Sequence, residues 1–213
     1  MQHKIITAAA ALTLITGNAS ANHVDFMTDG NFNISGPGFT VVAGDSANIL
    51  GGTRYVGIDT VDGASSASLM AGNDFIDFEN DVNAAGVLTL DYGDFMGGNG
   101  ALNADFDTDW DFVSVSFSDV VGDGVLSVSF ESSNGAGSSA SMVVDAAGTY
   151  SFGFDDAGFS MVDFSDIDRV TVTLMASADS DFRITSFTRE AVPAPSSLAL
   201  LGLGGFCASR RRR

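Results

Sequence analysis

Four carboxylates at alternate positions are the residues of this sequence best suited to bind a ligand. Residues 105–111 read DFDTDWD, which places the acids at Asp105, Asp107, Asp109 and Asp111. In an extended backbone alternate side chains project to the same side, and carboxylate oxygens are the hard ligands that Ca²⁺ prefers. We therefore expect a calcium site at this segment, with a solvated acidic loop as the alternative.

The segment does not follow the EF-hand pattern. A loop of that kind starting at Asp105 needs glycine at its sixth position and an acid at its twelfth, where this chain has Trp110 and Ser116. A calcium-binding corner between strands is the form that such a site would take here. Residues 155–156 and 179–181 contain aspartate pairs that are weaker candidates of the same kind.

The single tryptophan, Trp110, lies between two of these carboxylates. Its flat apolar face would suit a sugar ring, but a large aromatic side chain also fills the core of a β-sandwich well. We expect Trp110 in the core and keep a sugar-stacking role as the alternative.

The composition gives little support to enzyme chemistry. Beyond the first 21 residues the only histidine is His23, and the one cysteine, Cys207, lies near the C-terminus. Serine and cysteine nucleophiles are usually activated by histidine, and histidine-rich metal sites need several of these residues. A two-carboxylate glycosidase needs only acids, but an abundance of aspartate does not define a site. We expect no catalytic activity, with a polysaccharide hydrolase or lyase as an alternative.

The negative charge is concentrated in the middle of the chain. Five of the 9 Lys and Arg residues lie near the two ends, at Lys4 and Arg210 to Arg213, whereas all 27 acidic residues lie between Asp25 and Glu190. Four arginines remain against these 27 carboxylates, so the middle carries a net charge of about −23. Such a surface repels nucleic acid and anionic lipid headgroups, and neither is an expected partner of this region.

Period-two alternation predicts strands. Six short runs place apolar residues on one face and mostly hydroxyl-bearing or small residues on the other: residues 86–90, 112–117, 125–130, 149–154, 170–174 and 182–187. Turn signals such as Gly122-Asp123-Gly124 separate them. Of the acids 24 are aspartate, which favours turns over helix interiors. We predict an all-β domain, an antiparallel β-sandwich of about ten strands with jelly-roll topology.

The N-terminal segment has the features of a secretory signal peptide. An apolar run, Ile5–Ile15, is followed by small residues at Ala19 and Ala21. This arrangement predicts export with cleavage after Ala21; a buried N-terminal helix is the alternative, although the run is uniformly apolar rather than periodic. The expected organisation is a signal peptide at 1–21, a β-sandwich domain at 22–191 and a tail at 192–213.

The tail combines three elements of a membrane-sorting signal. Its proline motif is Val192, Pro193, Ala194 and Pro195; an apolar run, Leu198–Ala208, follows, and the chain ends on Arg210, Arg211, Arg212 and Arg213. The prolines favour an extended stretch that a processing enzyme can bind, and the arginines stay on the cytoplasmic side. The 17 residues from Pro193 to Ser209 span about 25 Å as a helix. The hydrocarbon core is ~30 Å thick, so the run suits a temporary anchor.

This tail resembles the PEP-CTERM sorting signal, the tag that exosortases of Gram-negative bacteria recognise. Ala194 departs from the pattern, because the family usually has glutamate there. The resemblance implies an exosortase-type partner, transient association with the inner membrane and cleavage near the proline motif. It also implies delivery to the cell envelope, cell surface or extracellular matrix, in association with exopolysaccharide. A permanent anchor with an arginine stop-transfer signal is the alternative.

A second resemblance concerns residues 149–188, which follow the order strand, Asp-rich corner, strand, short loop, strand. This order is similar to the closing half of the galactose-binding-like jelly rolls of carbohydrate-binding modules, and it implies binding of a glycan. The expected function is that of an exported surface or matrix protein without activity of its own. A calcium-assisted carbohydrate-binding module is the alternative.

Overall fold

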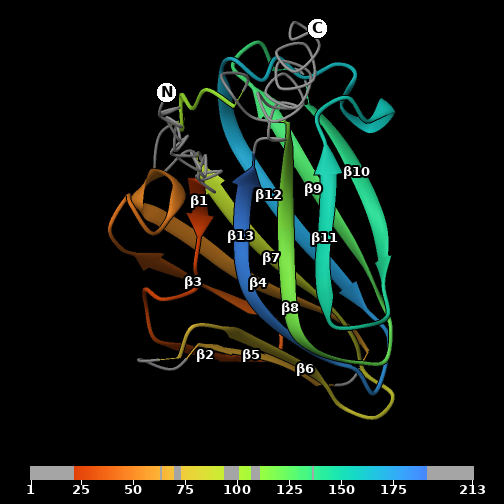
Figure 1. Ribbon diagram of the computed structural model, residues 1–213. Coiled ribbons are helices and arrows are strands. Elements are labelled where there is room, and N and C mark those ends of the chain that lie inside the picture. Colours follow the sequence, from red (N-terminus) through yellow and green to blue (C-terminus); the bar gives the residue numbers. More distant parts are fainter. Residues whose placement is uncertain are drawn as a thin grey trace, which may run out of the picture.

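Alternating apolar and polar side chains build two antiparallel sheets that stack face to face (Figure 1). The computed structural model describes residues 22–62, 64–69, 73–93, 101–106, 111–135 and 137–190. Strand β9 (Gly124–Ser132) illustrates the principle, because Leu126, Val128 and Phe130 are buried while the residues between them are more exposed. This pattern matches the two-residue period of a strand with one buried face.

The first sheet contains seven strands, in the order β11-β8-β13-β6-β5-β2, with β1 beside β13. Their bounds are β1 (Asn22–Asp25), β2 (Phe32–Ser35), β5 (Ser65–Leu69), β6 (Ile76–Asn80), β8 (Phe112–Val121), β11 (Gly148–Gly153) and β13 (Asp181–Glu190). The second sheet contains six strands, in the order β10-β9-β12-β7-β4-β3. The bounds of its other members are β3 (Gly38–Ala43), β4 (Thr53–Asp62), β7 (Ala85–Gly93), β10 (Gly137–Val144) and β12 (Ile167–Ala176).

Most connections cross from one sheet to the other. Only the pairs β3–β4, β5–β6 and β9–β10 are sequential neighbours within one sheet of the described chain. Such repeated crossing is the jelly-roll arrangement, so the predicted all-β antiparallel sandwich is confirmed. The six predicted runs lie in β7, β8, β9, β11, β12 and β13, and the run at 149–154 extends one residue beyond β11.

Phenylalanine rings close one end of the core. Phe130, at the end of β9, meets Phe159 and Phe164 edge-on, with ring centroids 5.3 and 5.1 Å away. Phe154 stacks on Phe164 at 4.3 Å, and Phe106 meets Phe130 at 5.5 Å. The short 3₁₀ turn η3 (Ala157–Phe159) supplies one of these rings. Aromatic pairs at such distances add to the energy of burial, and they anchor the loops that surround the end of β13.

The two ends of the domain meet in one sheet. Strand β13 pairs with β8 along one side, and with β6 and β1 along the other. Asn22 lies opposite Arg189, and His23 lies opposite Thr188. Residues 22–190 therefore include every described strand and the described core. No helix among the described residues is long and apolar enough to cross a membrane.

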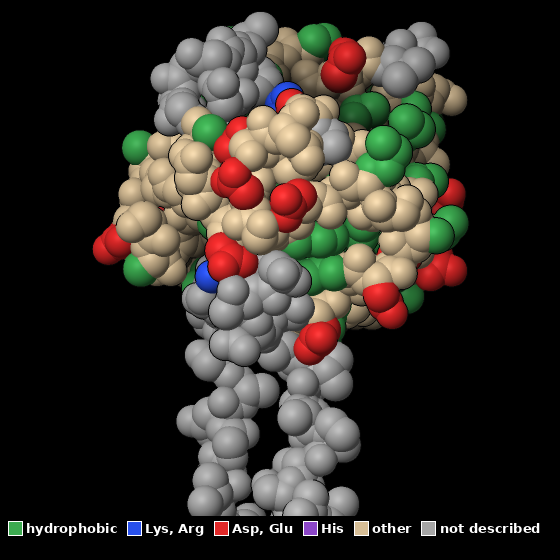
Figure 2. Space-filling view, turned by 90° about the horizontal axis from the view of Figure 1, so that it is seen from above, with side chains coloured by type: hydrophobic (Ala, Val, Ile, Leu, Met, Phe, Trp, Pro, Cys, Tyr) green, Lys and Arg blue, Asp and Glu red, His purple; other side chains and the backbone are tan. Residues whose placement is uncertain are grey.

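The outer surface is acidic. Figure 2, which views the sandwich from above, shows acidic side chains in red scattered over the visible surface and few basic side chains in blue. Of the four arginines of the domain, Arg54 is fully buried, so it adds nothing to the surface charge. Its partner Asp25 is buried with it, so the exterior keeps the strongly negative balance of the composition.

Candidate functional site

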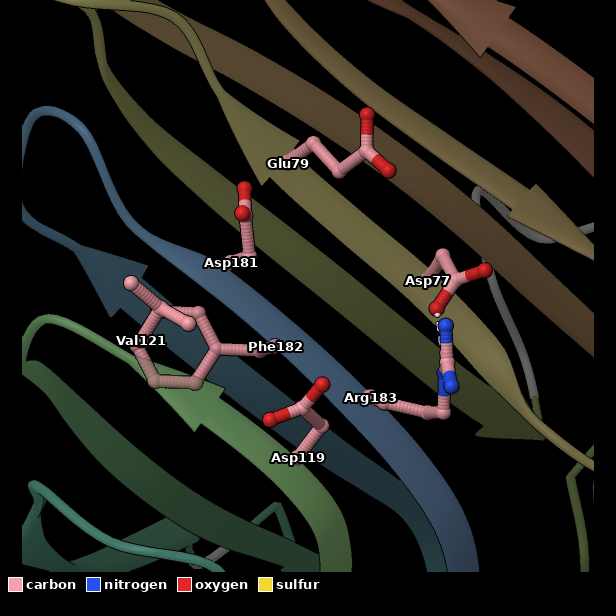
Figure 3. Close-up of a pocket in the computed structure, with 7 residues that line it drawn as sticks. All are labelled: Asp77, Glu79, Asp119, Val121, Asp181, Phe182 and Arg183. Atoms are coloured by element: carbon pink, nitrogen blue, oxygen red, sulfur yellow. Dashed lines mark hydrogen bonds and ion pairs between the residues drawn. The ribbon is translucent and has the colours of Figure 1, made fainter.

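A polar hollow of about 100 Å³ lies on the outer face of the first sheet, where β6, β8 and β13 run side by side (Figure 3). Its lining residues are Asp77, Glu79, Asp119, Val121, Asp181, Phe182 and Arg183. Most of these side chains are charged, which distinguishes this patch from the serine- and threonine-rich part of the same sheet.

The strand register gathers these charges. Arg183 of β13 lies between Asp119 of β8 and Asp77 of β6. In the next row outward, Asp181 lies between Val121 and Glu79. Alternate residues of a strand face the same side of a sheet. The two rows therefore bring four carboxylates and the guanidinium of Arg183 together on one face of the sheet.

Arg183 is the only cation among the described residues that line the hollow. Its Nε donates a hydrogen bond of 2.7 Å to Oδ1 of Asp77, which raises the pKa of Arg183. Its guanidinium also lies 4.2 Å from the centre of the Phe75 ring, a cation–π distance. The side chains of Arg183 and Asp77 are 40% and 26% exposed, so solvent screens the ion pair. The remaining carboxylates, drawn in Figure 3, are available to accept hydrogen bonds from hydroxyl groups.

Hydroxyl groups cover the neighbouring part of the same face. Oγ of Ser114 and Oγ of Ser151 are 2.8 Å apart, and Oγ of Ser116 is 3.0 Å from Oγ1 of Thr149. These cross-strand pairs join β8 to β11. The outer face of the first sheet therefore combines hydroxyl donors and acceptors with carboxylate acceptors, which is the chemistry that suits a polyhydroxylated ligand.

The predicted calcium segment begins and ends beside the last residues of β13. The carbonyl oxygen of Asp105 accepts a hydrogen bond of 2.8 Å from Nη1 of Arg189. The backbone N–H of Asp111 donates one of 3.1 Å to the carbonyl of Glu190. Asp107, Asp109 and Trp110 lie outside the described residues, so neither the metal site nor the place of the tryptophan is tested. In the part of the chain that is described, no three histidine, cysteine or acidic side chains gather as metal ligands would.

The segments predicted for processing adjoin the same end of the fold. Ala19 and Ala21 of the signal peptide, and the motif residues Val192 to Pro195 and Arg210 to Arg213, lie outside the described residues. Strand β1, however, begins at Asn22, and β13 ends at Glu190. Because these strands pair, both segments join the domain at neighbouring points.

A buried ion pair connects Asp25, the last residue of β1, to Arg54 of β4. Asp25 and Arg54 are both fully buried, and Nη1 of Arg54 bonds to Oδ2 of Asp25. The Tyr92 hydroxyl donates to the same oxygen at 2.8 Å, and the N–H of Met27 donates to Oδ1 at 2.8 Å. Nη2 of Arg54 donates to the carbonyl of Asp29 at 2.9 Å. Asp25, Arg54, Tyr92 and Met27 are buried, and Asp29 connects this network to the partly exposed surface.

Burial governs the titration of this network. It raises the pKa of Asp25, although the charge of Arg54 and the three hydrogen bonds oppose the effect. It also raises the pKa of Tyr92 well above the ordinary value, and the nearby Asp25 adds to this shift. Perturbed pKa values often mark active sites, but these side chains have no exposed surface through which a substrate could reach them. The network is structural.

Comparison with known protein families identifies a motif in the C-terminal segment. A model of the PEP-CTERM protein-sorting motif matches residues 191–213, directly after β13. The predicted resemblance of the tail is therefore confirmed. The chain is a β-sandwich domain that carries a PEP-CTERM protein-sorting motif at its C-terminal end. No curated protein matches the chain.

Solved structures are similar to this chain in fold. The family 11 carbohydrate-binding module of a cellulosomal cellulase of Clostridium thermocellum is 14% identical with a TM-score of 0.41, over 82% of this chain and 96% of that one. An exo-beta-agarase is 10% identical with a TM-score of 0.44, over 82% of this chain and 26% of that one. At such values, function has to be argued from the residues of this chain.

Sequence reasoning did not find the hollow. Asp181 was named only as half of a weak calcium pair, and Asp77, Glu79 and Asp119 were not singled out. The sequence does contain charged residues at alternate positions, Asp77 and Glu79 in one segment and Asp181 and Arg183 in another, and this pattern indicates a charged strand face. Only the pairing of β6, β13 and β8 shows that these short patterns belong together.

Proposed function

We propose that this protein is exported and then sorted by an exosortase-type enzyme to the cell envelope, cell surface or extracellular matrix of a Gram-negative bacterium, with no catalytic activity of its own. The observation that carries the proposal is the sorting motif at residues 191–213. In this scheme the apolar run holds the chain in the inner membrane for a time. Cleavage near Val192 to Pro195 then releases the acidic domain from its arginine-rich end.

The fold supports this order of events. The sorting motif starts one residue after the end of β13, so cleavage near its prolines removes no strand and no described core residue. Removal of the segment before Asn22 likewise leaves β1 intact. The domain would therefore survive both cuts with its sheets and core complete.

Deletion of Leu198 to Arg213 in the native host tests the proposal. The truncated protein should pass to the medium without a membrane-bound stage, whereas loss of the host's exosortase should trap a longer, membrane-bound form. A variant with Arg210 to Arg213 changed to glutamine keeps the length and the apolar run, and it isolates the contribution of the positive charges. Full-length protein at the surface of wild-type cells would show instead that the tail is a permanent anchor.

Glycan binding is a second candidate function, favoured by the hollow on the first sheet. Its four carboxylates and the exposed hydroxyl groups of Thr149 and Ser151 on the same sheet offer hydrogen bonds to a sugar's hydroxyl groups. A glycan-binding screen on residues 22–190 tests this proposal. The double change Asp77→Asn and Asp181→Asn should weaken any binding found. The matched change Asp59→Asn, at an exposed position of the second sheet, should leave it unaltered. An equal loss of glycan binding in the double variant and in the Asp59→Asn control would show that the hollow is not the binding site.

A further inference from the structure

The two sides of the sandwich differ in how their sheet edges are protected. Strands β2 and β3 are the last strands of the two sheets on one side, at the left of Figure 1, and they contact each other. Strands β10 and β11 form the opposite side. An open edge presents unpaired backbone N–H and C=O groups, and monomeric proteins usually block it with charge, proline, a bulge or a covering segment.

The edge at β10 is covered. The 3₁₀ turn η3 packs against β10, and the Ser138 hydroxyl donates a hydrogen bond to the carbonyl of Gly158 in that turn. An added Cβ on Gly158 would lie 2.7 Å from the carbonyl oxygen of Ser139, which shows how closely the two backbones approach. The turn thus occupies the space that a further strand would need beside Ser138 to Ala140.

The edge at β3 has none of these protections within the described chain. No described strand pairs with its outer side. Its register with β4 is unbroken from Gly38 opposite Ile58 to Ala43 opposite Thr53, so no bulge turns it away. Pro37 precedes the strand and leaves every backbone N–H of β3 intact.

The run that forms both edge strands is uncharged, although Asp29 and Asp45 lie at its two ends. The 15 residues from Gly30 to Gly44 include no acid or base, in a chain with 27 acidic residues. This run contains both β2 and β3. Large side chains are exposed within it, because Phe39 is 62% and Val41 is 49% accessible. The Phe39 ring lies 5.3 Å from that of Tyr55, which extends the apolar patch onto β4.

We propose that the β3 edge pairs antiparallel with β3 of a second copy of this chain, so that the second sheets of two copies form one continuous sheet. Two domains with a net charge of about −23 each repel one another, and they can approach most closely through a surface without charge. A two-fold symmetric contact places this uncharged strand against itself. Phe39 and Val41 of both copies would then form one apolar row across the junction, which stabilises paired strands.

Sedimentation of residues 22–190 over a range of concentrations tests the proposal. The wild-type domain should self-associate, and Val41→Glu should weaken the association at least tenfold, because a symmetric pair brings two new carboxylates together. The matched control is Val143→Glu on β10, the covered edge, where the valine is 62% exposed. The control should associate like the wild type. A wild-type domain that stays monomeric up to about 1 mM, or equal weakening by both changes, would overturn the inference.

Hydrogen exchange identifies which strand is involved. The amides of residues 38–43 should become protected as the concentration of the wild-type domain rises, while those of β10 should not change. Protection elsewhere without protection of β3 would contradict the pairing. If Val41→Glu does not fold, as judged by its circular dichroism, Phe39→Glu at the more exposed position takes its place. The proposal does not depend on sorting, since the domain alone is measured.

Discussion

Replacing Arg54 by methionine should expose how much the buried ion pair contributes to the fold. Methionine keeps an unbranched apolar stem, two atoms shorter than that of arginine, and removes the charge and the donors. Asp25 would then remain fully buried without its counter-ion. It would keep the hydrogen bonds from Tyr92 and from the N–H of Met27, both of 2.8 Å. The change therefore removes the guanidinium, with its charge and its hydrogen bonds to Asp25 and Asp29, while the other partners of Asp25 stay in place.

Removing one partner of a buried pair usually destabilises a protein by about 3–5 kcal/mol. Because two hydrogen bonds to Asp25 remain, we expect a loss near ~3 kcal/mol, at the lower end of that range. For a domain of this size each kcal/mol lowers Tm by roughly 2–4 °C, so Tm should fall by about 6–12 °C.

The loss should depend on pH. Burial raises the pKa of Asp25 above its ordinary value of 3.8, and the charge of Arg54 opposes that rise. Without Arg54 the pKa of Asp25 should therefore rise further. An acid whose pKa is raised in the folded state binds a proton there first, so the folded state gains stability as the pH falls through that pKa. The deficit of Arg54→Met should be largest at neutral pH and should shrink as Asp25 becomes protonated.

Urea unfolding of residues 22–190 between pH 4 and pH 8 measures this effect, subject to the domain staying folded at each pH. The matched control is Arg183→Met, which removes the partly exposed partner of Asp77. A surface pair contributes only about 0–1 kcal/mol. The double change Asp25→Asn with Arg54→Met should recover part of the loss, because no charge then remains buried. A deficit in Arg54→Met no larger than in the control, or one that does not vary with pH, would refute this account of the network.

Three further changes test the core, a turn and the metal hypothesis. Phe130→Ala should cost about 3–5 kcal/mol of unfolding free energy, as deletions of buried aromatic rings do, with urea unfolding as the measurement. Gly93→Ala should destabilise by more than ~1 kcal/mol, because Gly93 has a φ of 108° and an added Cβ would press on the carbonyl of Asp168; an unchanged Tm would contradict this. Millimolar Ca²⁺ should raise Tm by mass action, and less so in the double variant Asp107→Asn and Asp109→Asn, whereas an equal shift with Mg²⁺ or added salt would indicate charge screening alone.

The second half of the domain was predictable because its strands alternate cleanly. In β8, β9 and β12 hydroxyl-bearing residues stand between apolar ones, so the local pattern identifies the strand and its buried face. Strands β1 and β2 have only four residues each. Segments this short carry too few repeats of the pattern to stand out, and β1 follows directly on the apolar N-terminal segment.

The charged features depend on contacts between distant residues. Asp25 and Arg54 look like ordinary surface residues in the sequence, and only the pairing of β1 with β13 and the path of β4 bury them together. The hollow likewise joins strands β6, β8 and β13, whose lining residues are up to 106 positions apart. The sorting motif was found from sequence because its proline, apolar and arginine parts are consecutive, so it needs no tertiary structure to be recognised.

The intact mass of the mature protein, recovered from the envelope and the medium of its host, tests export and sorting most directly. One spectrum reports both ends of the chain. We predict a species that begins at Asn22 and ends near Val192 to Pro195, without Cys207 and without Arg210 to Arg213. A surface-exposed species that still begins at Met1, or that retains the four C-terminal arginines, would contradict the central claim that this domain is released by cleavage at both ends.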